Sequence, residues 1–270
     1  MPNKNKNGSW SGMLGWVQAQ DLIAVENFEE HNVVVSSLFA NIYNNKHKKI
    51  KTLSIGTALT ATFDPDQNMY HVIIPQKCCG WIKASDVITL SQGTELSEPQ
   101  LRANIIKTAQ QFLGDPYSWG GRTPQTTLWP VSSVDCSGLI NLVFTAQGFL
   151  IPRNSATQYM KATHIKHGKD LQQGDLIFFA NKKHTISHVI VYSGNGNIIE
   201  SSLTAGKVVE SSFKKRIGFD HTKMKSGDLS GPIMTAESAN PMFFKVYFAS
   251  FLSDKQMIHK LRHEFLRTDY

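Results

Sequence analysis

The 270-residue sequence contains no continuous apolar run of about 18 residues, the length that a membrane-spanning helix requires. Its start, MPNKNKNGSWSG, is polar and lacks the apolar segment of a secretory signal. We therefore expect no membrane span. Two locations stay open: the cytoplasm, or the periplasm or cell envelope after removal of a leader.

Cysteine is also scarce, and three residues in the whole chain exclude a disulfide framework. Cys78 and Cys79 are adjacent, and a bridge between neighbouring cysteines is strained. We expect both to be small buried residues in a strand. Cys136 stands between an aspartate and a serine, just before an apolar run, and is the candidate for thiol chemistry.

Acidic residues are outnumbered by basic ones, 21 against 28, which gives a formal net charge of +7. Such a surplus favours an anionic partner. The basic residues nevertheless lie in small separate groups, such as NNKHKKIK (44–51) and FKKR (213–216), without the interleaved aromatic residues of a nucleic-acid platform. We therefore expect a solvated basic surface and no nucleic-acid partner.

A faint repeat indicates how the N-terminal part is organised. The segment LGWVQAQDLI (14–23) matches CGWIKASDVI (79–88), and their tryptophans are 65 residues apart. That period corresponds to one small β-barrel, so the repeat indicates tandem modules. We expect residues 1–25 to be the tail of a possible first module and residues 26–92 to form an all-β barrel.

Short segments rich in β-branched and aromatic residues lie between the two copies, and turn clusters separate them, as is typical of strands. Examples are NVVVSSLFANIY and TALTATFDP. The polar segment SQGTELSEPQ (91–100) contains Gly and Pro and is the expected linker. Taken alone, the barrel predicts a binding or positioning module.

The remainder, residues 98–270, has a different pattern. Ser97 and Pro99 mark a helix start, an apolar stripe follows, and Gly114 marks the end. A second helix begins near Cys136, and the strand-like segments DLIFFA, HVIVYSG and NIIESS come next. This order predicts an α+β fold with a mainly antiparallel sheet. In the tail we expect MFFKVYFASFL to be a strand and DKQMIHKLRHEFL to be an amphipathic helix.

The segment SSVDCSGLINLVFTAQG predicts a helix with Cys136 in its first turn. Apolar residues recur at helical spacing from Leu139 to Phe144, and Gly148 supplies a stop. In a first turn, unpaired amides and the helix dipole favour an anion, and therefore a nucleophilic thiolate. The same local pattern also fits a buried cysteine that begins a core helix.

A base and an orienting group for Cys136 come from a predicted hairpin, HTISHVIVYSGNGNIIESS. Alternation places His188, Ile190 and Tyr192 on one strand face. The turn SGNGN then brings Glu200 back beside His188. We predict that the Glu200 carboxylate orients the imidazole of His188, which acts as the base for Cys136. A histidine at the start of a strand also fits a surface or capping residue.

His184 offers a rival interpretation. It precedes His188 by four residues, so a strand would place both on one face, where Glu200 could complete a two-histidine, one-carboxylate metal site. Such a metal site would give Cys136 no chemical role. The polar stretch NKKHT, which contains His184, is also typical of an exposed turn. We therefore expect no metal and no other cofactor.

Several segments now carry a resemblance to a known family. Their order and spacing over about residues 98–215 are similar to those of the NlpC/P60 cysteine peptidases, papain-like bacterial enzymes that cut peptidoglycan stem peptides. The barrel in front resembles the bacterial SH3 domains of members that cleave γ-D-glutamyl bonds to a diamino acid. The matching segments are GDPYSWGG, DCSGL, IPRNS, GDLIFF and SHVIVYSGNGNIIES.

The resemblance implies a catalytic set. It makes Cys136 the nucleophile and His188 the general base. The third polar residue falls at Glu200, where many members carry histidine. A glutamate would still orient the ring, and its charge would favour a thiolate–imidazolium pair more strongly, so the departure affects the expected pH optimum more than the mechanism.

The resemblance also implies substrate contacts. Asp135 occupies the position of an aspartate that helps bind the amine of a free N-terminal L-Ala. Ser137 and Ser155 match serines that help hold the substrate, and Tyr117 matches a tyrosine beside the nucleophile. Asn154 replaces a common aspartate, which makes specificity at that subsite less defined. The long insertion RTPQTTLWPVSSV is expected to reshape one wall of the cleft.

The sequence thus predicts a thiol endopeptidase that cleaves γ-D-Glu bonds to diaminopimelate or lysine in murein tri- and tetrapeptides, for cell-wall turnover or recycling. No oligomeric state follows from the sequence. The barrel is expected to wall off the amine end of the substrate, so that only short, free-ended peptides fit. Two alternatives stay open: an amidase or acyltransferase on the same fold, and a catalytically silent wall-binding protein.

Overall fold

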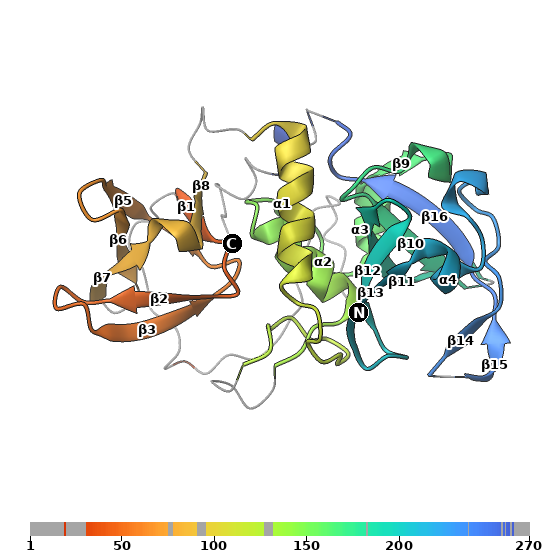
Figure 1. Cartoon of the computed structure of the whole chain (residues 1–270), viewed down its shortest axis with the longest axis horizontal. Helices are drawn as coiled ribbons and strands as arrows, with labels where there is room; N and C mark the ends of the chain where they lie inside the picture. The colour runs from red at the N-terminus through yellow and green to blue at the C-terminus, as the bar shows by residue number, and fades with distance from the viewer. Residues whose placement is uncertain are drawn as a thin grey trace.

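The computed structural model describes residues 31–74, 78–90, 96–126, 132–181, 183–236 and 238–254, together with positions 19, 256, 258, 259 and 261. The first copy of the repeat and the possible first module therefore lie outside the described residues, apart from Ala19. Figure 1 shows three blocks side by side: a β region on the left, two helices in the middle and a larger sheet on the right.

The N-terminal block is all β, as predicted. Its strands are β1 (Val33–Val35), β2 (Phe39–Tyr43), β3 (Lys49–Ser54), β4 (Ala58–Leu59), β5 (Ala61–Asp64), β6 (Met69–Ile74), β7 (Cys78–Lys83) and β8 (Val87–Thr89), with the 3-10 turn η2 (Ala84–Asp86). They form two antiparallel sheets, β4–β1–β8 and β3–β2–β7–β6–β5. Both sheets contribute apolar side chains to one core, which closes this block as a small unit.

The segment 32–43 forms the two short strands β1 and β2, with a bend between Val35 and Phe39. One detail of this block differs from the sequence-based prediction. Cys79 lies in β7 as predicted, but its side chain is exposed and not buried. Its cross-strand partner Ile73 is exposed as well, since both point away from the core on the outer face of their strands.

The second block combines α-helices with a large sheet. The helices are α1 (Glu98–Gln110), α2 (Cys136–Thr145), α3 (Ser155–Lys161) and α4 (Phe213–Ile217), with 3-10 turns η3 (Gly168–Asp170) and η4 (His221–Lys223). The strands are β9 (Thr163–Ile165), β10 (Leu176–Ala180), β11 (Ile186–Gly194), β12 (Asn197–Ser202), β13 (Lys207–Ser212), β14 (Ile233–Thr235), β15 (Ser238–Met242) and β16 (Lys245–Ser250).

Six of these strands form one antiparallel sheet in the order β13–β12–β11–β10–β16–β9, and β14 pairs with β15 in a separate hairpin. Mixed helices and an antiparallel sheet match the predicted α+β class. The predicted strand in the tail is confirmed as β16, which lies between β10 and the edge strand β9. Of the predicted closing helix, only separate positions between 254 and 261 are described, and Ile258 N donates to Asp254 O at 2.9 Å.

Helix α1 begins where the sequence predicts. Ser97 is the N-cap, and its amide donates to Oε1 of Gln100 at 3.0 Å in a capping box. Farther along the helix, Arg102 Nη1 donates to Oδ1 of Asp175 at 2.8 Å. Because both side chains are buried, this ion pair fixes α1 against the start of β10.

The large sheet buries both of its faces. On β11, Val189 and Val191 belong to the core that packs against α1 and α2, whereas Ile190 and Tyr192 belong to the core on the opposite face, beneath α4. This is the alternation that the sequence predicted for the strand. The hairpin of β11 and β12 is therefore held from both sides, which gives the side chains at its edge a fixed position.

The β block docks on one end of α2. Ile55 is buried in the same core as α2, and a Cβ atom on Gly56 would lie 3.0 Å from Cγ2 of Thr145. Thr145 ends α2, whereas Cys136 begins it, about 13 Å away at 1.5 Å per residue. These contacts lie at the far end of the helix and do not test the prediction that the barrel walls off the cleft, which stays a prediction.

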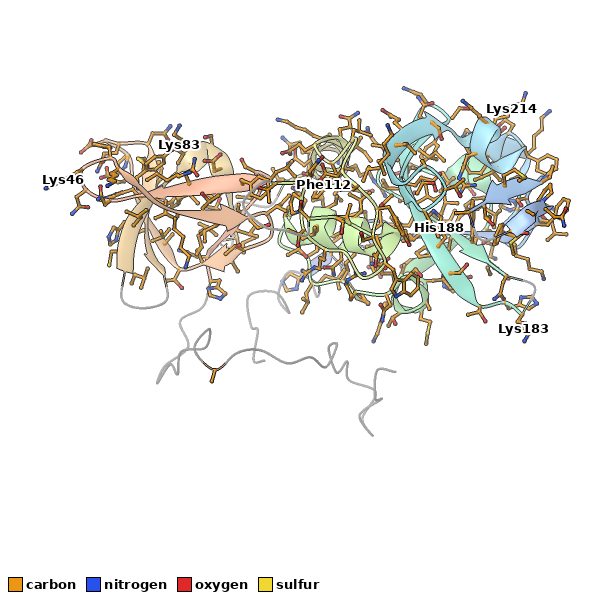
Figure 2. The ribbon with its side chains drawn as sticks, turned by 90° about the horizontal axis from the view of Figure 1, so that it is seen from below. Lys46, Lys83, Phe112, Lys183, His188 and Lys214 are labelled. Atoms are coloured by element: carbon orange, nitrogen blue, oxygen red, sulfur yellow. The ribbon has the colours of Figure 1, made fainter. Side chains whose placement is uncertain are left out.

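Several lysines lie on the surface, as the sequence predicts for its scattered basic groups. Figure 2 shows Lys46, Lys83, Lys183 and Lys214 at the periphery of the molecule, and all four are exposed, whereas His188 lies within the second block. No helix in the described ranges is long and apolar enough to cross a membrane.

Candidate active site

The start of α2 presents Cys136. Asp135 is the N-cap, and its Oδ1 accepts a hydrogen bond from Gly138 N at 2.6 Å. Cys136 is the first residue of the helix and is buried, as the sequence predicts. In this first turn the amides of Cys136 and Ser137 have no acceptor within the helix, so they form a positive end beside the sulfur.

A glycine-rich loop packs directly on this turn. Gly120 N donates to Oδ2 of Asp135 at 2.9 Å, and Asp135 N donates to Gly121 O at 3.0 Å. A Cβ atom on Gly138 would lie only 2.3 Å from Gly121 O. The DCSG sequence therefore needs glycine at its last position, because loop and helix meet there backbone to backbone.

Arg153 completes the cap from the other side. Its Nη1 and Nη2 donate to the two carboxylate oxygens of Asp135 at 2.9 and 2.8 Å, and Nη1 also donates to Oγ of Ser137 at 3.0 Å. The Ser137 hydroxyl in turn lies 3.3 Å from Asp135 Oδ1. The Asp135 carboxylate thus accepts hydrogen bonds from two backbone amides, one hydroxyl and the two terminal guanidinium nitrogens of Arg153. These bonds hold the start of the helix in place.

His188 and Glu200 meet across the β11–β12 hairpin, as predicted. Nε2 of His188 lies 2.7 Å from Oε2 of Glu200, and the two side chains are 18% and 2% exposed. Cys136 interacts with the same imidazole through its charge and through hydrogen bonding, and both effects raise the pKa of His188. Since Nε2 is bonded to Glu200, Nδ1 is the ring nitrogen left for the sulfur. The structure therefore brings Cys136, His188 and Glu200 into one chain of contacts.

The charges in this chain support one another. Burial alone lowers the pKa of His188, but the charges of Cys136 and Glu200, and the hydrogen bonds that the ring donates to them, raise it to about 10. Burial alone raises the pKa of Glu200, but His188 and Arg216 lower it to about 2. At neutral pH an imidazolium beside the Glu200 carboxylate is therefore the favoured state.

Arg216 is a member of this site that the sequence did not reveal. Its Nε donates to Oε1 of Glu200, and its Nη2 donates to Oε2 at 3.2 Å. The prediction of a solvated basic surface at FKKR holds for Lys214 and Lys215 and is wrong for Arg216, which is 19% exposed. The difference arises because α4 buries Phe213 and Ile217 and thereby turns the arginine toward the sheet.

The other two predicted substrate residues, Tyr117 and Ser155, lie just before the glycine-rich loop and at the start of α3. Tyr117 is half-buried, and its amide donates to Gly206 O at 2.9 Å. Ser155 begins α3 behind the N-cap Asn154. Beside the cap of α2, a hollow of about 260 Å³ is lined by Ser118, Trp119, Gly120, Gly121, Arg122, Thr123 and Ser133. Trp119 is 86% exposed there, and part of the long insertion, 127–131, lies outside the described residues.

His184 does not join the site. It adopts a left-handed conformation with φ 59° in the turn before β11, so it is not on the strand face of His188. Its Nδ1 lies 3.2 Å from the Tyr247 hydroxyl. The prediction that His184 and His188 share one strand face, which the metal site would need, is therefore wrong. Within the described ranges, no group of three His, Cys, Asp or Glu side chains is placed to hold a metal ion.

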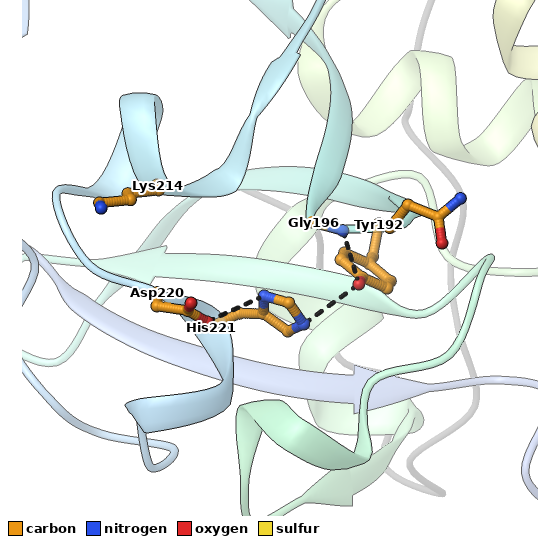
Figure 3. A pocket seen from close by; sticks show the side chains of 6 residues that line it. Tyr192, Gly196, Lys214, Asp220 and His221 are labelled. Carbon is orange, nitrogen blue, oxygen red and sulfur yellow. Dashed lines mark hydrogen bonds and ion pairs between the residues drawn. The ribbon is translucent and has the colours of Figure 1, made fainter.

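A second hollow, of about 370 Å³, lies near the end of β11 and is shown in Figure 3. The Tyr192 hydroxyl accepts from Gly196 N at 3.0 Å and lies 3.2 Å from Nε2 of His221, while Nδ1 of His221 faces Asp220 at 3.5 Å. Tyr192 follows His188 by four residues, about 13 Å along the strand. This hollow is thus separate from the thiol, and its polar groups are engaged with one another.

Comparisons with known proteins identify the family. Residues 114–227 match the model of the NlpC/P60 family. The γ-D-glutamyl-L-lysine dipeptidyl-peptidases of Bacillus cereus and Bacillus subtilis are 29% and 30% identical over 197 and 218 residues, which are 70% and 78% of this chain. Peptidoglycan endopeptidase RipB of Mycobacterium tuberculosis is 39% identical over 117 residues, 41% of this chain and 47% of that protein.

The chain spans 56% and 67% of the two Bacillus proteins. A crystal structure of an NlpC/P60 family protein from Bacillus cereus superposes with a TM-score of 0.56 at 28% identity, over 73% of this chain and 62% of that one. Since the family model, the relatives and the superposition all agree, this chain belongs to the NlpC/P60 family.

Proposed function

We propose that this chain is a thiol endopeptidase that hydrolyses γ-D-Glu–diamino acid bonds in peptidoglycan stem peptides. The observation that carries the proposal is the chain of contacts from Cys136 at a helix start through His188 to the buried Glu200. A nucleophile, a base and an orienting group in this order are what covalent acyl transfer needs. The names of the two Bacillus relatives support the γ-D-glutamyl bond as the target.

The reaction follows from this geometry in two steps. The Cys136 thiolate attacks the γ-carbonyl carbon, and the amides at the start of α2 stabilise the oxyanion. The C–N bond then breaks as the His188 imidazolium gives its proton to the departing amine, which leaves an acyl-enzyme. Neutral His188 next takes a proton from water, the hydroxide attacks the thioester, and thiolate and γ-D-glutamyl product are released.

We further propose a division of labour along the chain. Residues 98–270 form the catalytic domain, and residues 26–92 form an SH3-like domain that positions it. The β block has an apolar core of its own, although Ile55 packs into the core of the second block, and this core supports the division. Peptidoglycan fragments are the proposed partner of the whole protein.

The finer specificity that we propose is a free N-terminal L-Ala, whose amine binds at Asp135. Because the carboxylate already accepts five hydrogen bonds, an amine has to replace one of them. The Ser137 hydroxyl at 3.3 Å is the longest of the five and is the contact that we expect to yield. Tyr117 and Ser155 are the proposed contacts to the rest of the peptide.

One set of incubations tests these proposals. The full chain and a Cys136→Ala variant are incubated with L-Ala-γ-D-Glu-diaminopimelate, with L-Ala-γ-D-Glu-Lys and with the N-acetylated form of each. Mass spectrometry should detect L-Ala-γ-D-Glu and the free diamino acid from the unblocked peptides with the wild type alone. Release of another fragment points to an amidase, and no release with slow alkylation of Cys136 points to a silent wall-binding protein.

A further inference from the structure

We propose that Arg216 is a positioning residue of this site, which holds the Glu200 carboxylate in the orientation that His188 needs. The inference rests on the proposed roles of Cys136 and His188. It adds a fourth side chain to the site, one that touches neither the sulfur nor the imidazole nitrogens and acts through the carboxylate between them.

The contact geometry is that of a two-point clamp. Arg216 donates from Nε to Oε1 of Glu200 and from Nη2 to Oε2, which is the oxygen that also accepts from His188. Two parallel hydrogen bonds between a guanidinium and a carboxylate fix both the position and the plane of the carboxylate. The plane of the carboxylate in turn fixes the direction of the bond to Nε2 of His188.

The buried aromatic ring of Phe179 contacts both Arg216 and His188. The Cζ atom of Arg216 lies 5.3 Å from the centre of the Phe179 ring, in a cation–π contact. The Phe179 ring is also 5.7 Å from the His188 ring, and the two residues are paired across β10 and β11. Guanidinium and imidazole therefore rest on one rigid surface, so a shift of the arginine is transmitted to the neighbours of the histidine.

The charges of the site require such a partner. Thiolate, imidazolium, carboxylate and guanidinium alternate in sign along the chain of contacts. Glu200 is 2% exposed and has no access to water that would stabilise its charge, so His188 would be its sole cationic contact in the described structure without Arg216. A buried carboxylate that loses a partner either protonates or turns toward another donor, and either change withdraws support from the imidazolium.

Helix α4 does not depend on Arg216 for its own stability. Its buried residues are Phe213 and Ile217, its N-cap Ser212 accepts from Lys215 N, and Gly218 ends it in a left-handed conformation. The helix is therefore anchored by its buried apolar side chains, while the Arg216 side chain extends toward Glu200. Removing the guanidinium should therefore leave the helix folded, which makes the inference testable by substitution.

Three variants test the role in catalysis. Arg216→Met keeps an unbranched stem over Phe179 and removes the clamp, Arg216→Lys keeps the charge and loses the fork, and Lys215→Met removes an exposed charge from the same helix. With L-Ala-γ-D-Glu-Lys we expect kcat to fall about tenfold to a hundredfold in Arg216→Met with KM within about twofold, because the positioned base is lost. Arg216→Lys should recover part of that loss, and Lys215→Met should match the wild type.

A second readout does not depend on the substrate. Alkylation of Cys136 by iodoacetamide, followed by mass spectrometry of its peptide from pH 4 to 10, reports the reactive thiolate. In Arg216→Met we expect the acid side of this profile to move to higher pH, because an unsupported Glu200 protonates more easily. A shifted profile in a protein that cleaves no murein peptide supports the clamp and overturns the proposed function; equal kcat and equal profiles overturn the clamp.

A double variant separates positioning from general destabilisation. Glu200→Gln removes the charge that Arg216 holds, so Arg216→Met added to Glu200→Gln should cause little further loss of kcat. Losses that multiply would mean that Arg216 acts independently of Glu200, and that outcome overturns the proposal.

Discussion

Nε2 of His188 lies 2.7 Å from Oε2 of Glu200, across two neighbouring strands of the sheet. This contact decides which nitrogen of the imidazole faces the thiol, because a ring that donates from Nε2 presents Nδ1 to Cys136. It also places a full negative charge behind the ring, where a neutral acceptor would provide orientation alone.

The charge behind the ring predicts the alkaline side of the pH profile. The pKa of His188 is raised to about 10 from an ordinary 6.5, so the imidazolium persists through neutral pH and is lost as the pH rises through about 10. We expect kcat/KM to hold up to about pH 9 and then to fall. In Glu200→Gln the carboxylate no longer raises the pKa, and the fall should begin at lower pH.

The measurement is kcat/KM on L-Ala-γ-D-Glu-Lys between pH 6 and 11, with circular dichroism at each pH to confirm that both proteins stay folded. An alkaline limb at the same pH in both proteins would contradict the role assigned to Glu200.

The thiol and metal interpretations make opposite predictions. Iodoacetamide should abolish activity by alkylating Cys136, and Cys136→Ala should reduce kcat/KM to the background, since the neighbouring Ser137 hydroxyl is bound to Asp135 and Arg153. A strong chelator such as EDTA should leave the rate unchanged. Activity that survives alkylation and disappears with the chelator would remove Cys136 from its proposed role.

The elements that position the site follow from local patterns. An aspartate at the N-cap, followed by apolar residues at helical spacing, predicts that α2 starts at Cys136. The pairing of His188 with Glu200 follows from strand alternation on both sides of a glycine-containing turn. In each case the signal lies within about 20 residues of sequence, which is the range over which helix and hairpin periodicity works.

Contacts that depend on how one element packs on another do not follow from such local patterns. Arg216 reaches Glu200 because α4 packs on the sheet, and FKKR by itself resembles any exposed basic turn. Likewise, the ion pair between Arg153 and Asp135 forms only because the segment after α2 folds back onto the start of the helix. His184 fails as a strand residue because its backbone is left-handed, which a four-residue spacing does not reveal.

Gly138 is predicted to tolerate no side chain. In Gly138→Ala the new Cβ would lie 2.3 Å from the carbonyl oxygen of Gly121, so the loop or the helix start has to move. Because Cys136 lies two residues earlier, we expect kcat/KM to fall by about a hundredfold even in molecules that remain folded. Ser137→Ala serves as a neighbouring control, with a smaller effect confined to KM; a fully active Gly138→Ala would refute the close packing.

Arg153 is predicted to stabilise the fold through Asp135. Arg153→Met leaves a buried carboxylate without its cation and should reduce the free energy of unfolding by about 3 kcal/mol. Adding Asp135→Asn removes the unpaired charge, so the double variant should be more stable than Arg153→Met alone. Urea denaturation of the three variants checks this order, and a double variant that is weaker still would show that the ion pair is not the cause.

The last prediction concerns the β block and its contact with α2. Ile55 is buried against the helix, so Ile55→Ala should reduce the free energy of unfolding by about 2–4 kcal/mol through the cavity that it leaves. The contact lies at the Thr145 end, about 13 Å from Cys136, and we therefore expect kcat and KM for the free tripeptide to be unchanged per folded molecule. Ile42→Ala, which opens a cavity inside the β block itself, is the matched control, because it lowers stability without touching the contact with α2. A KM that rises in Ile55→Ala but not in Ile42→Ala would mean that the docked block shapes the substrate site, and that its role reaches beyond positioning the catalytic domain.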